Sequence, residues 1–201
     1  SRRRYEFYRA GELAARASTD WVYLDRHTLR PATVPPEMVQ AFAPEGMADN
    51  PAPRGHFPPQ PPPPPGMHTV RRRVEWRDID TAQHVNNAAY LNYIEDAGIQ
   101  AVAAFGWPME RMTADGFAII ARKHHIEYRA QAKLDDELDV STWVSNGKRA
   151  TAIRHYTIKR PATGDLIAQA STLFVWVDVQ TMQPMRIPPH FIADFATHIV
   201  P

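Results

Sequence analysis

Beyond residue 66 the chain shows first a strand pattern and then a helix pattern. Residues 68–77 alternate basic and apolar side chains, the two-residue period of a strand with one buried face. From residue 87 to about residue 105, apolar side chains recur three and four positions apart. This spacing predicts a helix that Gly106 and Pro108 end, and whose apolar wall a sheet buries.

Four more strands and a short helix are predicted after this long helix. Runs rich in β-branched and aromatic residues, separated by turn residues, lie at 117–130, 137–145, 149–160 and 166–179. In the third run, Ala152, Arg154, Tyr156 and Ile158 share one face. A terminal helix opens at Pro188 and runs to about His198. The order of elements predicts an α+β domain in which a curled antiparallel sheet wraps around one helix.

Prolines divide the chain into segments. The sequence contains 19 prolines, and 13 of them lie between Pro31 and Pro65. Proline lacks the backbone donor that a helix interior or a sheet ladder needs, so we expect residues 47–66 to be an extended polyproline II segment. This segment is either a stiff linker between two folded units or a ligand for a proline-binding domain, and we favour the linker.

The segments on either side of this linker resemble each other. A shift of 153 positions aligns residues 17–42 with residues 170–195 without a gap, and 10 of the 26 positions are identical. We therefore interpret residues 1–46 as the C-terminal part of a first unit and residues 67–201 as a complete second unit. We expect a second polypeptide, or a segment outside this sequence, to supply the rest of the first unit. The alternative is that the N-terminal hairpin alone was duplicated and packs as an extra strand pair.

Composition excludes several classes of protein. The net charge is +1, without the basic excess of a dedicated nucleic-acid binder. Because cysteine is absent, disulfide scaffolds, thiolate metal sites and thiol nucleophiles are excluded, and a cytoplasmic location is favoured. No apolar run is long enough to span a membrane. His124 and His125 are neighbours on a predicted strand, so they point to opposite faces and do not form a metal site together.

The densest group of polar side chains lies between the first strand and the long helix. It contains Asp78 and Asp80, then His84, and then a pair of asparagines before Tyr90. The pattern Asp-x-Asp-x-x-x-His-Val-Asn-Asn-x-x-Tyr, followed by Tyr-x-Glu, resembles the hotdog-fold thioesterases. Within them it is similar to the 4-hydroxybenzoyl-CoA thioesterase-like family. The resemblance covers residues 67–195.

This resemblance implies a fold, an assembly and a substrate class. It implies a hotdog fold, here in a tandem (double hotdog) arrangement whose two units pair side by side into one continuous sheet. The active site would lie where the units pair, and we expect an oligomer of tandem units. The substrate would be an acyl-CoA or an acyl-acyl carrier protein (acyl-ACP). No cofactor or metal is implied.

The resemblance also assigns roles within the loop. Asp80 would be the catalytic residue, either activating water or attacking the thioester carbonyl, and His84 would act directly or order the loop. A helix N-terminus offers unpaired N–H groups and partial positive charge, so Asn87 and Ala88 would stabilise the oxyanion. The capping residue Asn86 and the nearby Tyr90 complete the expected substrate-binding set. Glu95, on the helix, is not expected to act in catalysis.

Two other functions are compatible with the same fold. One is a non-hydrolytic acyl-thioester-binding or regulatory module, which would have no need of the Asp80 carboxylate. The other is a hydratase or dehydratase, whose sites resemble a different loop. The loop pattern of this sequence therefore favours hydrolysis over both.

Overall fold

The computed structural model describes residues 1–28, 30–46, 57–145 and 147–200. The chain divides into two units, Ser1–His56 (unit 1) and Phe57–Pro201 (unit 2), and each has its own geometry. In the described ranges, no helix has the length and apolar character needed to cross a membrane.

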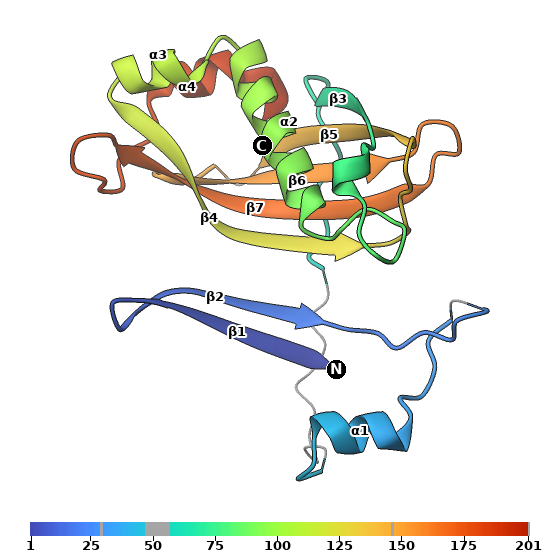
Figure 1. Ribbon diagram of the computed structural model, residues 1–201. Coiled ribbons are helices and arrows are strands. Elements are labelled where there is room, and N and C mark those ends of the chain that lie inside the picture. The colour runs from blue at the N-terminus through green and yellow to red at the C-terminus, as the bar shows by residue number, and fades with distance from the viewer. Residues whose placement is uncertain (29, 47–56, 146, 201) are drawn as a thin grey trace. The chain divides into compact units, whose positions relative to one another are not determined.

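A five-stranded sheet forms the frame of unit 2 (Figure 1). The strand order is β3-β5-β6-β7-β4, so β3 and β4 are the two edges, and all neighbours run antiparallel. The strands are β3 (His68–Arg73), β4 (Phe117–Tyr128), β5 (Glu137–Ser145), β6 (Thr151–Lys159) and β7 (Leu166–Asp178).

One long helix, α2 (Ala89–Ala104), lies across the inner face of this sheet (Figure 1). Its buried residues Tyr93, Ile94 and Ala97 pack with apolar side chains of β5, β6 and β7 in one core cluster. The helix approaches closely at Gly98, where a Cβ would stand 3.0 Å from the Tyr156 hydroxyl of β6. The predicted α+β architecture, a long helix on an antiparallel sheet, is confirmed.

The ends of several elements differ from the prediction. Helix α2 starts at Ala89 rather than at residue 87, and β3 ends at Arg73 because a 3₁₀ turn, η1 (Trp76–Asp78), follows. A short helix, α3 (Met109–Ala114), was not predicted. The expected terminal helix is present as α4 (Pro189–Asp194) and a 3₁₀ turn, η2 (Ala196–His198).

Residues 57–66 of the proline-rich segment pack on the outer face of the sheet. The side-chain amide of Gln60 donates hydrogen bonds to the carbonyl oxygens of Tyr156 (3.2 Å) and Ala170 (2.8 Å). The Phe57 ring contacts the ring of His125 on β4, with 4.7 Å between centroids. This half of the expected linker is therefore part of unit 2, while residues 47–56 lie outside the described residues.

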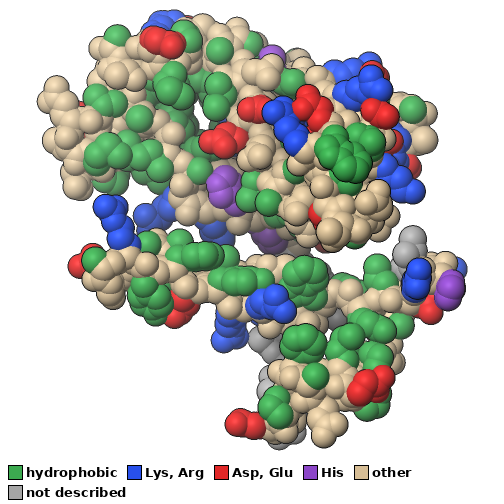
Figure 2. Space-filling view, in the orientation of Figure 1, with side chains coloured by type: hydrophobic (Ala, Val, Ile, Leu, Met, Phe, Trp, Pro, Cys, Tyr) green, Lys and Arg blue, Asp and Glu red, His purple; other side chains and the backbone are tan. Residues whose placement is uncertain are grey.

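Unit 1 is a hairpin followed by a helix. Strand β1 (Arg2–Arg9) pairs antiparallel with β2 (Glu12–Asp20), and α1 (Pro36–Phe42) follows. None of the described residues of unit 1 is buried. Figure 2 shows its apolar side chains at the surface. By itself, unit 1 therefore has no hydrophobic core.

The local geometry of unit 1 recurs in unit 2 with the spacing that the sequence repeat predicts. Oδ1 of Asp25 accepts hydrogen bonds from the N–H groups two and three residues later, and Oδ1 of Asp178 does the same. Leu24 bridges to Pro31 as Val177 bridges to Pro184, and Tyr5 pairs with Ala17 as Tyr156 pairs with Ala170. The pairing of hairpin β1–β2 and the turn after it therefore match those of β6–β7, and α1 follows β2 at the spacing at which α4 follows β7.

Gly66 offers a test of the packing of the proline-rich segment. A Cβ at this position would collide with the backbone carbonyl of Thr197. We predict that Gly66→Ala lowers the free energy of unfolding, measured in urea, by about 1–3 kcal/mol, the usual cost of overpacking. Gly147→Ala is the matched control, because nothing lies within 4 Å of the added methyl group. Equal stability of the two variants would contradict the described packing.

Candidate active site

Asp78 organises the backbone of the polar loop. It is buried, and its Oδ2 accepts a hydrogen bond from the N–H of Glu75 at 3.0 Å. The N–H of Asn86 donates to the Asp78 carbonyl oxygen at 2.8 Å. This second bond brings residues 78–80 alongside the start of α2, so Asp78 fixes the loop on which Asp80 lies.

Asp80 is half-buried, and only one of its carboxylate oxygens is engaged. Oδ1 accepts a hydrogen bond from the N–H of Ala82 at 2.8 Å, and the Asp80 N–H donates to the carbonyl of His84 at 3.0 Å. The Nδ1 atom of His84 lies 3.9 Å from Oδ1, beyond hydrogen-bond distance. Oδ2 has no hydrogen bond to any residue that the structure describes. The loop thus holds the carboxylate by one oxygen and leaves the other available.

The two N–H groups that the sequence suggested as oxyanion donors, at the start of α2, differ in their hydrogen bonds. The N–H of Ala88 donates to the side-chain Oδ1 of Asn86 at 2.8 Å, so this donor is already satisfied. The Tyr128 hydroxyl donates to the carbonyl of Asn87 at 3.0 Å and ties the helix start to β4. Within the described part of the chain, the N–H of Asn87 donates to no residue. Of the two donors that the sequence suggested, the N–H of Asn87 therefore remains available to a ligand, and that of Ala88 does not.

Tyr90, which the resemblance placed in the substrate-binding set, lies in the core. Its side chain is 3% exposed, and its ring contacts those of Tyr93 and Tyr128 edge-on. Burial raises the pKa of Tyr90 to about 12, so its hydroxyl is protonated at neutral pH. Its position makes Tyr90 a packing residue that anchors the first turn of α2.

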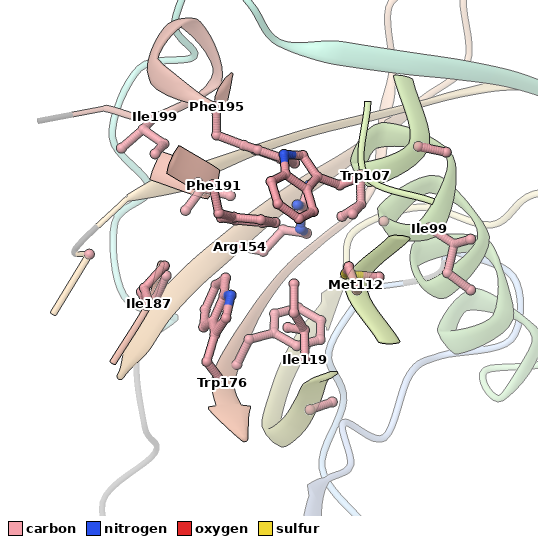
Figure 3. A pocket seen from close by; sticks show the side chains of 18 of the residues that line it. Ile99, Trp107, Met112, Ile119, Arg154, Trp176, Ile187, Phe191, Phe195 and Ile199 are labelled. Atoms are coloured by element: carbon pink, nitrogen blue, oxygen red, sulfur yellow. The ribbon is translucent and has the colours of Figure 1, made fainter. Parts of the chain in front are cut away.

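A cavity of about 970 Å³ lies between α2, α3, α4 and the inner face of the sheet (Figure 3). Apolar and aromatic side chains dominate its wall, among them Trp107, Met112, Ile119, Trp176, Ile187 and Phe191. The predicted loop residues are not among its lining residues. Leu91 does line it, and Leu91 follows Asn87 by four residues, about 6 Å of helix rise. The sequence pattern did not predict this cavity, because its lining residues come from elements between residues 91 and 200 that only the fold brings together.

The two adjacent histidines of β4 point to different neighbours, as the strand geometry predicts. His124 lines the cavity, with Nδ1 3.0 Å from the Thr172 hydroxyl, whereas His125 contacts Phe57 on the other face. Burial lowers the pKa of both imidazoles. In the described ranges, no cluster of three or more histidine or acidic side chains is arranged to hold a metal ion.

Comparison with protein families places this loop and fold in a known group. Residues 74–195 match the family model of the thioesterase-like superfamily. The chain belongs to this family. The expected membership in a family of thioester-hydrolysing enzymes is confirmed.

Solved structures confirm the hotdog fold of unit 2. A 1,4-dihydroxy-2-naphthoyl-CoA thioesterase from Synechocystis superposes with a TM-score of 0.61 at 20% identity, over 65% of this chain and 96% of that one. The probable thioesterase YbaW from Escherichia coli superposes with a TM-score of 0.58 at 25% identity, over 66% and 99% of the two chains.

Three relatives have names that state an activity. The acyl-CoA thioester hydrolase YbgC of Escherichia coli is 28% identical over 123 residues, which are 61% of this chain and 91% of the relative. The long-chain acyl-CoA thioesterase FadM of the same species is 30% identical over 118 residues, 57% and 86% of the two chains. The chloroplastic acyl-acyl carrier protein thioesterase ATL3 of Arabidopsis thaliana is 23% identical over 167 residues, 83% of each chain.

Two buried histidines of unit 2 predict how stability depends on pH. Burial lowers the pKa of His155 and of His198 to about 4, below the ordinary value of 6.5. Between pH 4 and pH 6.5 these two histidines bind more protons in the unfolded chain than in the folded one. The free energy that they contribute to folding is therefore fully present above about pH 6.5 and is lost as the pH falls toward 4. Urea titrations across this range should show the decline, and His155→Gln should reduce its slope, whereas the exposed His27→Gln should not. A flat wild-type profile would contradict this prediction.

Proposed function

We propose that unit 2 hydrolyses acyl thioesters of CoA or of acyl carrier protein, with Asp80 as the catalytic residue. The observation that carries the proposal is the half-buried Asp80 carboxylate, held through one oxygen beside the start of α2. Membership in the thioesterase-like superfamily and the names of YbgC and FadM support CoA as the carrier. The name of ATL3 supports acyl carrier protein.

Asp80 has two routes to hydrolysis. As a general base, its free Oδ2 takes a proton from water, whose oxygen bonds to the thioester carbon. As a nucleophile, Oδ2 itself bonds to that carbon and forms a mixed anhydride, which water then cleaves. In both routes the C–S bond breaks, and the sulfur leaves with its electron pair and is protonated to the thiol.

The negative charge that develops on the thioester oxygen needs a donor nearby. The N–H of Asn87 is available, and the partial positive charge of the α2 N-terminus acts in the same direction. Asn86 supports this arrangement by capping Ala88. His84 is a positioning residue in this proposal, because its carbonyl accepts the Asp80 N–H while its imidazole stays 3.9 Å away.

The acyl group and a second hotdog unit complete the proposed site. The apolar cavity receives the acyl group, since its wall begins at Leu91, one turn beyond Asn87. Strand β4 is an unpaired edge of the sheet, and its Tyr128 holds Asn87. We expect another hotdog unit to pair along this edge, continue the sheet and close the site. A cytoplasmic location stays a prediction.

Asp80→Asn tests the catalytic assignment. The substitution keeps the size of the side chain and removes the charge that acts as base or nucleophile. We predict a loss of kcat/KM of about a hundredfold or more, measured as free-thiol release from a panel of acyl-CoAs. Asp135→Asn is the control, because Asp135 forms an exposed ion pair with Arg73 and should leave activity within about twofold. If Asp80→Asn kept full activity, the catalytic residue would have to be a residue other than Asp80.

We also infer that unit 1 is the C-terminal part of a first hotdog unit, which precedes the complete one. Residues that are core in unit 2 have exposed counterparts in unit 1. Phe42 is 77% exposed where Phe195 is 1% exposed, and Tyr23 is 37% exposed where Trp176 is 5% exposed. In unit 2 these positions are covered by the α2 and β5 half of the domain. Unit 1 therefore needs a further segment like residues 67–145 to cover these positions, and the proposed source is a second polypeptide or a segment outside this sequence.

Hydroxyl-radical footprinting tests this inference on the unmodified chain. In the recombinant 201-residue protein, Phe42 should be oxidised readily and Phe195 should be protected. In protein isolated intact from its natural source, Phe42 should be protected as well, because the completing segment covers it. Equal oxidation of Phe42 in both preparations would leave only the alternative of a duplicated hairpin.

A further inference from the structure

The charged residues around the cavity fall into two groups. Glu95, Glu110 and Lys148 line it but are exposed to solvent. Arg154, on β6, lines it and is only 6% exposed. Figure 3 shows Arg154 on the cavity wall among aromatic side chains that include Trp107 and Phe191. The interior of this apolar cavity therefore carries one buried cation.

The neighbours of Arg154 do not neutralise its charge. Its Nη1 donates to the Thr142 hydroxyl at 3.3 Å and to Nε2 of His198 at 2.9 Å. His198 uses its other nitrogen, Nδ1, to donate to the carbonyl of Gly66 at 2.9 Å, so its imidazole is neutral. In the described part of the chain, no carboxylate forms an ion pair with Arg154. The guanidinium is thus held in place by neutral groups.

Burial of a guanidinium without a counter-ion costs desolvation free energy, and arginine stays protonated even when it is buried. An anion in the cavity would remove the penalty, and carboxylates fit the planar fork of arginine. The CoA phosphates are a poorer match, because several negative charges would have to pass the exposed Glu95 and Glu110. An apolar chain that ends in a single carboxylate matches the apolar lining of the cavity and the positive charge of Arg154.

We propose that Arg154 binds a carboxylate at the far end of the acyl group, so that the preferred substrates are thioesters of medium- to long-chain dicarboxylic acids. The inference rests on the proposed thioester hydrolysis. Arg154 reaches the cavity opposite Gly98, where its Cδ lies 3.7 Å from the place that a Cβ on this glycine would take. Gly98 follows Asn87, the proposed donor to the thioester oxygen, by eleven residues, about 16 Å of helix rise. This separation between the reacting carbonyl and the cation excludes short diacids.

Hydrolysis of two thioesters of equal length tests the proposal. The substrates are dodecanoyl-CoA and the CoA monothioester of dodecanedioic acid. Wild-type protein should favour the dioic thioester, and Arg154→Met should lower kcat/KM for it by about tenfold or more, the scale of one charged hydrogen bond. The same variant should leave dodecanoyl-CoA within about threefold. Arg154→Lys should retain part of the preference, and Arg149→Met, on the exposed loop before β6, should retain all of it.

A binding measurement separates this proposal from the proposed hydrolysis. Trp107 and Trp176 line the cavity, so their fluorescence reports occupancy without any reaction. Dodecanoate should bind to wild-type protein about tenfold or more tighter than dodecanol, and Arg154→Met should abolish the difference. If neither thioester is hydrolysed but this difference is found, the proposed function fails and the carboxylate site stands.

Three outcomes would overturn the carboxylate site. They are a wild-type preference for dodecanoyl-CoA, an equal loss on both thioesters in Arg154→Met, and equal binding of dodecanoate and dodecanol. The folding of Arg154→Met is checked by thermal unfolding, where exchange of a buried charge for an apolar side chain should not lower Tm. If the variant does not fold, the comparison of dodecanoate with dodecanol on wild type and Arg154→Lys decides the question.

Discussion

The close packing of α2 on the sheet determines where every part of the candidate site lies. At Gly98 the Tyr156 hydroxyl occupies the space that a side chain would need, so the helix has one register on β6. The helix begins at Ala89, and the hydrogen bond from the Asn86 N–H to the Asp78 carbonyl oxygen ties this helix start to the loop of Asp80. The cavity is what remains between the later turns of α2, helices α3 and α4, and the sheet.

The sequence predicted those features that depend on local periodicity. The bounds predicted for β5 are those observed, and Arg154 shares a face with Tyr156 and Ile158 as the alternation of β6 indicated. Helix α3 was missed because six residues are too few to show a helical period, and Pro108 was interpreted only as the end of α2. Periodicity alone does not show that Arg154 lies on the inner face of the sheet, because that depends on how strands distant in sequence pair.

The sequence indicated which residues are candidates for the site, but not how their side chains lie. The loop pattern identified Asp80, and the structure gives this carboxylate one satisfied and one available oxygen. The surroundings of Ala88 and Tyr90 could not be predicted because they depend on side-chain placement. The Asn86 side chain accepts the Ala88 N–H, and the Tyr90 side chain is buried in the core. The cavity could not be predicted, since its wall is assembled from helices and strands that are far apart in sequence.

The most direct test of the account is a crystal structure of the full chain with a ketone analogue of dodecanoyl-CoA, in which a methylene group separates sulfur from the carbonyl. We predict that the carbonyl oxygen lies within hydrogen-bond distance of the Asn87 N–H and that the carbonyl carbon lies beside Oδ2 of Asp80. The acyl chain should lie in the cavity beside Gly98. A carbonyl group remote from Asp80, or an acyl chain outside the cavity, would contradict it.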